Sequence, residues 1–185
     1  SSLRAEESQE ETELNLMIRN NLGILYAEMG QLKHAFEFFK RARELNPELL
    51  APHLNLIISL SKNKDTQTAL GYLENLLQEF PFKDPFEKFL LLFWKSLLLD
   101  PKSPAYQKNI SEATALLDQN QDLAKRIQRE ECSTRLLTAG YFSLNPTFTL
   151  RKGFSIPITL SQQIFFLVSP GTDAIQLDQF LRLVR

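Results

Sequence analysis

A spacing of 34 residues recurs in the first half of this 185-residue chain, where residues 16–49 align with residues 50–83. The first window has small and apolar residues at regular helical intervals: Leu22, Gly23, Tyr26, Gly30, Ala35, Phe39, Ala42 and Pro47. The corresponding places in the second window hold Leu56, Leu60, Ala69, Leu73, Leu76 and Pro81. A period of this length is typical of stacked helical hairpins.

Each window is expected to form two antiparallel helices. Apolar residues at i, i+4 and i+7 give each helix one apolar face that needs a partner. Gly23 and Ala35 are small where the two helices have to approach closely, and Gly30 suits the end of the first helix. Pro47 disfavours helix at the residue before it and so ends the second helix. The predicted unit is a helix, a turn and a helix.

The segment NNLGILYAEMGQLKHAFEFFKRARELNP resembles a tetratricopeptide repeat and departs from that family's signature only at Arg19, where Trp is usual. The second unit, HLNLIISLSKNKDTQTALGYLENLLQEFP, is a weaker match, because His53, Ile57 and Lys64 replace the family's Trp, Gly and turn Gly. The resemblance implies a superhelix of stacked hairpins. Its inner curve is expected to bind another polypeptide.

A third, degenerate unit is expected after Pro81, and its first helix contains the run KFLLLFWKSLLL. This run is shorter than the ~20 apolar residues of a membrane span and contains two lysines, so it is predicted to be a buried helix. The second half of the unit breaks register. A helix is expected to restart there with Ser103 as N-cap and Pro104 in its first turn. Its apolar face would comprise Tyr106, Ile110, Ala113 and Leu117.

The apolar run is expected to have a packing side and a mixed side. By the family's geometry, the packing side meets neighbouring helices through Phe86, Phe89, Leu90, Phe93, Trp94 and Leu97. The mixed side looks toward the inner curve. The resemblance therefore implies a partner-binding groove lined by Asn20, Ile24, Leu54, Asn55, Ile58, Lys62, Lys88, Leu92 and Lys95. Apolar anchors bordered by lysines predict an apolar partner segment with acidic residues.

The groove has an alternative interpretation, because exposed apolar patches are rare on soluble monomers. The chain's own C-terminal third could cover the strip and make it part of the core. A last helix is predicted after Gly171, and its apolar face would suit this occlusion. That face comprises Ile175, Leu177, Phe180, Leu181 and Val184. Before it, alternating apolar residues around Gly153 suggest a short hairpin or an irregular extended segment.

The expected fold is all-α, with two clear repeats, one degenerate repeat and a small irregular or β-containing appendage. An acidic, poorly ordered segment is predicted at 1–13, a repeat-like helical domain at 14–137, and an appendage packing on that domain at 138–185. A further helix is expected over about residues 122–137.

Several kinds of site are disfavoured by the sequence. Two histidines and one cysteine are too few for the usual tetrahedral zinc ligands, and no nucleophile or phosphate-binding motif occurs, so we expect no catalytic residues, metal or cofactor. A net charge of −1 gives no field that would recruit nucleic acid. Some co-chaperone members of the family hold a carboxylate with Lys, Asn and Arg, but here Ile24 and Pro85 interrupt that set.

These patterns predict a non-catalytic interaction module that acts as an adaptor, scaffold or assembly factor. Two alternatives stay open: a repeat chaperone for a secreted or envelope protein, and a regulatory part of a larger enzyme. We expect a soluble protein without a transmembrane segment. The sequence begins without methionine, so both a cytoplasmic and a periplasmic location are open, the latter if a signal or lipid anchor was removed.

Overall fold

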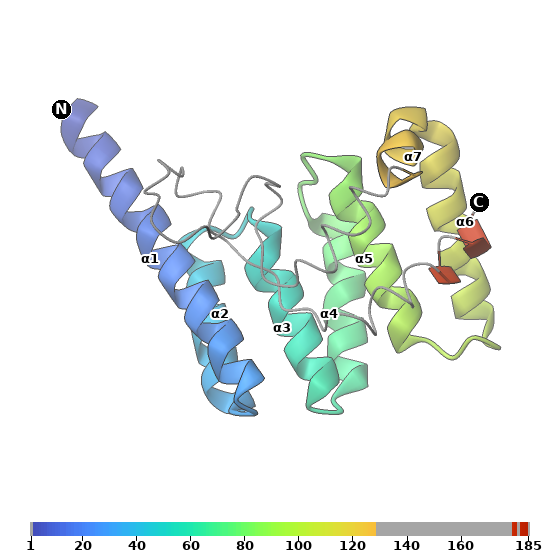
Figure 1. Ribbon diagram of the computed structural model, residues 1–185, viewed down its shortest axis with the longest axis horizontal. Coiled ribbons are helices and arrows are strands. Elements are labelled where there is room, and N and C mark those ends of the chain that lie inside the picture. The colour runs from blue at the N-terminus through green and yellow to red at the C-terminus, as the bar shows by residue number, and fades with distance from the viewer. Residues whose placement is uncertain (1, 129–178, 181, 185) are drawn as a thin grey trace, which may run out of the picture. The chain divides into compact units, whose positions relative to one another are not determined.

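The computed structural model describes residues 2–128, 179–180 and 182–184. Every element within these residues is an α-helix, as the sequence predicted for the repeats (Figure 1). The described residues divide between two compact units, the first ending at Ser59 and the second beginning at Leu60.

The first unit is built on an antiparallel hairpin of two helices of unequal length. Helix α1 comprises Ser2–Glu28 and helix α2 comprises Leu32–Leu45, and the two pack along α2 (Figure 1). The side chains of α2 that were predicted to face α1 are fully buried: Ala35, Phe39 and Ala42. Helix α3, Leu50–Lys62, follows and contributes its residues up to Ser59 to this unit.

Close packing between α1 and α2 depends on a glycine and on a stack of rings. A Cβ atom added to Gly23 would lie only 2.5 Å from Cε1 of the buried Phe39, so only glycine fits there without movement. Further along, the ring of Tyr26 stacks on His34 and on Phe38, with centroid separations of 5.3 Å and 5.2 Å. The predicted close approach of the two helices is therefore confirmed.

The turns that end α1 and α3 have the same conformation, 34 residues apart. Gly30 has φ 75°, and Lys64 at the matching place has φ 61°. In the first turn, Gln31 N–H bonds to Tyr26 O over 2.8 Å, and in the second, Asp65 N–H bonds to Leu60 O over 3.0 Å. A hydrogen bond from the sixth residue to the first, with the fifth residue in the left-handed conformation, is the Schellman motif at the C-terminus of a helix. The repeat predicted from spacing is thus present in the backbone of both turns.

Within the described residues of the second unit, four helices follow α3 and pack in chain order. They are α4, Thr66–Glu79; α5, Pro85–Leu98; α6, Pro104–Gln119; and α7, Gln121–Gln128. Helix α4 packs on α5, α5 on α6, and α6 on α7 (Figure 1). Helix α5 contains the apolar run and is the most buried helix of this unit, and its residues from Phe89 to Trp94 are all buried. The run is a core helix, as predicted.

The boundaries of α5 and α6 follow from their caps. Asp84 accepts a hydrogen bond from Phe86 N–H, while Glu87 accepts one from Asp84 N–H, which makes a capping box. Ser103 accepts from Tyr106 N–H over 3.1 Å, as predicted for an N-cap followed by proline. These polar residues satisfy N–H groups that have no partner within a helix.

The face of α6 is less apolar than the sequence suggested. Ala113 and Leu117 are buried as predicted, but Tyr106 and Ile110 are only half-buried. The side chain of Asn109 is buried beside them, and its Nδ2 donates to Leu92 O on α5 over 2.8 Å. An amide therefore links α5 and α6 where an apolar side chain was expected.

Some predictions concern residues outside the described part of the chain. The hairpin near Gly153 and the later part of the helix expected at 122–137 lie there, and only α7 is observed within that helix. At the other end, α1 begins at Ser2 and so includes residues 2–13 of the acidic segment predicted at 1–13, whose order in solution stays a prediction. Within the described residues, no helix has the length and apolar character required to cross a membrane.

Candidate partner-binding site

The nine residues predicted to line a groove lie on three helices and in both units. In the first unit they are Asn20 and Ile24 on α1, and Leu54, Asn55 and Ile58 on α3. In the second unit they are Lys62 at the end of α3, and Lys88, Leu92 and Lys95 on α5. All the apolar members are buried, as are both asparagines. Only Lys62 is exposed, and the other two lysines are half-buried.

The two asparagines of the first unit lie together in its interior. Asn55 Nδ2 donates to Asn20 Oδ1 over 2.9 Å, and Asn20 Nδ2 donates to Asn21 Oδ1 over 3.3 Å. Both Asn20 and Asn55 have 0% exposure. A buried amide costs free energy unless it is hydrogen-bonded, so this pair joins α1 to α3. The structure brings these predicted site residues together, and it gives them a structural contact.

The lysines of α5 differ in their surroundings. Lys95 Nζ lies 3.3 Å from Glu74 Oε1 on α4, and its side chain is only 15% exposed. This ion pair directs Lys95 toward α4. Lys88 lies one turn before Leu92 and is half-buried. Of these two, Lys88 is therefore better placed to meet a charge from a partner.

Residues near the C-terminus contact α5 in the second unit. The ring of Phe180 lies 5.6 Å, centroid to centroid, from the rings of both Phe89 and Phe93. Phe180 is 2% exposed, as is Val184 one turn later. Tilted ring pairs at this separation are favourable beyond the area that they bury. Helix α5 thus accommodates an aromatic anchor from a segment about ninety residues away in sequence.

The sequence contained part of the signal for this contact. The apolar face predicted for the last helix included Phe180 and Val184, and that helix was expected to need a groove. Phe89 and Phe93, however, were assigned to packing against neighbouring helices. The sequence did not reveal that α5, which is buried on several sides, packs against the segment containing Phe180, which is distant in sequence. Occlusion of the predicted strip by this segment stays a prediction.

The histidines of the first unit are held by structural contacts. His34 stacks on Tyr26, and His53 Nε2 lies 2.7 Å from Pro47 O. Burial lowers the pKa of His53, the hydrogen bond to Pro47 acts in the opposite direction, and the charge of Arg43 lowers it further. A neutral ring with its proton on Nε2 fits this geometry. Among the described residues, no group of three His, Cys, Asp or Glu could hold a metal ion.

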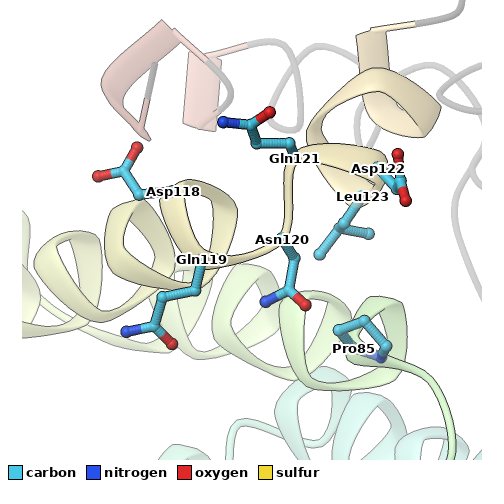
Figure 2. Close-up of a pocket in the computed structure, with 7 residues that line it drawn as sticks. All are labelled: Pro85, Asp118, Gln119, Asn120, Gln121, Asp122 and Leu123. Atoms are coloured by element: carbon cyan, nitrogen blue, oxygen red, sulfur yellow. The ribbon is translucent and has the colours of Figure 1, made fainter.

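A hollow of about 590 Å³ lies at the junction of α6 and α7 in the second unit (Figure 2). Its lining residues are Pro85, Asp118, Gln119, Asn120, Gln121, Asp122 and Leu123. Figure 2 shows Asn120 and Leu123 pointing toward Pro85, while the side chains of Asp118 and Gln121 point away from it. Asn120 Nδ2 donates to Leu116 O, and the N-terminus of α5 is already capped by Asp84. The lining is mainly polar, without a set of converging groups that would indicate chemistry.

Comparison with known proteins supports the interpretation of the first hairpin. Residues 17–49 match the family model of the tetratricopeptide repeat. This match covers the second half of α1 and all of α2, and it confirms the resemblance seen in the sequence. No curated protein sequence and no solved structure matches the chain.

Proposed function

Because residues 17–49 match the family model of the tetratricopeptide repeat, we propose that this chain is an adaptor, scaffold or assembly factor that binds a segment of another protein. Repeats of this kind generally mediate protein–protein interaction, and stacked hairpins offer extended surfaces for it. The inference from fold to binding is an analogy, so the site has to supply its own support. That support comes from α5.

The observation that carries the proposal is the contact of Phe180 with α5. The site formed by Phe89 and Phe93 already accepts an aromatic side chain from a distant segment of the same chain. A partner segment with an aromatic or aliphatic anchor could replace Phe180 there in the helix-in-groove or extended-peptide manner. The neighbouring Lys88 favours a partner with acidic residues beside its anchor. The last segment of this chain has that chemistry, with Asp178 two residues before Phe180.

The wider groove, and the superhelix that would shape it, are parts of the same proposal. Its apolar members are buried in the conformation described here, so a partner reaches them only where covering side chains move. Substituting Ile58 with a charged residue would therefore test the core as much as the groove. Lys88 and Phe180 are better positions for a test, because Lys88 is partly exposed and Phe180 is the anchor that a partner would replace.

The proposal is tested with a labelled peptide of residues 172–185 and the full-length Phe180→Ala chain. We expect the peptide to bind this variant more tightly than wild type, since the internal anchor no longer competes. The ring centroid of Trp94, the chain's only tryptophan, lies 5.7 Å from that of Phe93. Its fluorescence should therefore change when the peptide binds beside Phe93. A peptide with alanine in place of its phenylalanine is the matched ligand control.

The contribution of the Lys88 charge to peptide binding is tested by adding Lys88→Glu to the Phe180→Ala chain. Lys102→Glu, at an exposed lysine outside α5, is the matched control. Lys88→Glu should weaken peptide binding and Lys102→Glu should leave it unchanged. Equal binding by wild type and the Phe180→Ala chain, or no binding by either, would show that α5 does not act as a replaceable anchor site.

A further inference from the structure

Helix α1 has a second apolar face, which is exposed to solvent. Its side chains are Leu14, Ile18, Leu25 and Met29, which are 40%, 44%, 59% and 67% exposed. Met29 follows the end of α1, and its N–H bonds to Leu25 O and so continues the last turn. At 100° per residue these four positions fall within an arc of about 60° and extend over about 22 Å. We call this set the α1 stripe.

The α1 stripe lies on the side of the helix opposite to its packed face. The packed face includes Leu16, Ile24 and Ala27, which are buried in the first unit. Exposed apolar residues scattered singly over a surface are ordinary, but four in one line along a helix are typical of an interaction surface. A helix with apolar residues on opposite sides is expected to pack on both.

We propose that the α1 stripe pairs with the α1 stripe of a second copy of this chain, with the two helices antiparallel. The intervals along the stripe are four, seven and four residues, so the pattern is the same in both directions. A two-fold axis between residues 21 and 22 therefore brings Leu14 against the partner's Met29 and Ile18 against the partner's Leu25. A surface that complements itself in this way is what a two-fold dimer requires.

The charges along α1 favour the antiparallel orientation over the parallel one. Glu10, Glu11 and Glu13 are exposed at the N-terminal end of the stripe. A parallel pair would place the two acidic ends side by side, at a cost in free energy. In the antiparallel pair, each acidic end lies instead at the C-terminal end of the partner's α1, which the exposed Lys33 of the partner follows in the first turn of α2.

The start of α2 adds to this complementarity. Its N-cap, Gln31, makes no side-chain hydrogen bond to the helix, and its first turn contains no acidic residue. The N-terminus of a helix carries a partial positive charge and favours nearby carboxylates. The partner's Glu11, which is exposed and falls within the arc of the stripe, would supply a carboxylate near that end. Midway along the stripe, half-buried Asn21 is a polar residue of the kind that specifies register in paired helices.

The proposal is tested by measuring the mass of the full-length chain by sedimentation equilibrium over a range of concentrations. We expect the wild type to form a reversible dimer. Ile18→Glu and Leu25→Glu should each weaken the dimer by roughly tenfold or more, because each places a carboxylate against an apolar side chain. Leu45→Glu, at an exposed leucine of α2 outside the stripe, is the matched control and should leave the dimer intact.

A paired substitution tests the orientation. The chain with both Ile18→Glu and Leu25→Lys should dimerise again, because residue 18 faces residue 25 of the partner and each Glu then meets a Lys. In a parallel pair, like charges would meet and the dimer would stay weak. Circular dichroism of each variant checks that it is folded. A monomeric wild type, a dimer insensitive to the stripe variants, or failure of the paired substitution to restore it would each overturn the proposal.

Discussion

At the scale of single residues, Gly23 decides how closely α1 and α2 pack. The ring atoms of Phe39 occupy the space that any side chain at residue 23 would need. Gly71, in the middle of α4, is exposed and has no neighbouring atom within 4 Å of an added Cβ. The same substitution at the two glycines therefore separates the effect of packing from the effect of backbone flexibility.

We expect Gly23→Ala to lower the free energy of unfolding by about 1–2 kcal/mol, because the cost of overpacking exceeds the gain in helix propensity. Gly71→Ala should instead raise it by roughly 0.5–1 kcal/mol, since only the propensity changes. Urea denaturation of both variants measures the two effects. If Gly23→Ala stabilised the chain as much as Gly71→Ala, the two helices would not be in contact at residue 23.

Lys64 is a residue of the wrong type for its backbone conformation. It has φ 61°, a left-handed value that costs a side chain about 1–2 kcal/mol. Lys64→Gly removes this cost from the folded state, but glycine also gives the unfolded chain more conformational freedom, which offsets part of the gain. The substitution should therefore raise the free energy of unfolding by roughly 0.5–1 kcal/mol. Gly30→Ala, with open space around it but φ 75°, should lower it by about 1 kcal/mol. Thermal and urea unfolding of both variants measure these changes in the free energy of unfolding. Changes of the same sign in the two variants would contradict the expectation.

At the scale of elements, the helix ends were the part most readily predicted from sequence. Ser103 with Pro104 fixed the start of α6, and the glycine of the first turn fixed the end of α1, because these residues satisfy or redirect the backbone locally. Lysine is not typical of a left-handed position, so the turn at Lys64 was indicated by the 34-residue period and not by the type of residue. The buried amide of Asn109 could not be foreseen, since its partner is a carbonyl on α5 that no local pattern reveals.

The junction between α2 and α3 contains the buried His53, whose Nε2 lies 2.7 Å from Pro47 O. Burial lowers the pKa of His53 below its ordinary value of about 6.5, so the folded chain keeps the ring neutral while the unfolded chain binds a proton at a higher pH. The unfolded state then holds more protons below about pH 6.5, and linkage makes the folded state less stable as the pH falls. The contribution of the neutral ring is fully present above that pH.

We therefore expect the free energy of unfolding of wild type, relative to His53→Gln, to decrease as the pH is lowered from about 7.5 to about 5. Glutamine is the matched variant because it can donate to Pro47 O but does not titrate in this range. Urea denaturation at several pH values gives the difference between the two proteins. A difference that stays constant or grows toward low pH would show that protonation of His53 is not suppressed by folding.

At the scale of the whole molecule, the sequence predicted hairpins more securely than the surfaces between them. The period reports which residues share a face of a helix, so Ala35, Phe39, Ala69 and Leu73 were correctly placed in the interior. It does not report which distant segment covers a face. That is why the pairing of Phe180 with Phe89 and Phe93, and the outward apolar face of α1, could be identified only in the structure. The candidate groove was inferred from family geometry, and its binding role stays a prediction.

A dimer formed through the α1 stripe would couple association to the stability of the whole chain. A second copy that binds only folded protein stabilises it by mass action, so the midpoint of thermal unfolding should rise with protein concentration. We expect this rise for wild type and for Leu45→Glu between about 2 and 200 μM, and no rise for Ile18→Glu. Repeated scans establish that unfolding is reversible. A midpoint that is independent of concentration in all three proteins would mean that folding of this chain requires no second copy and gains nothing from one.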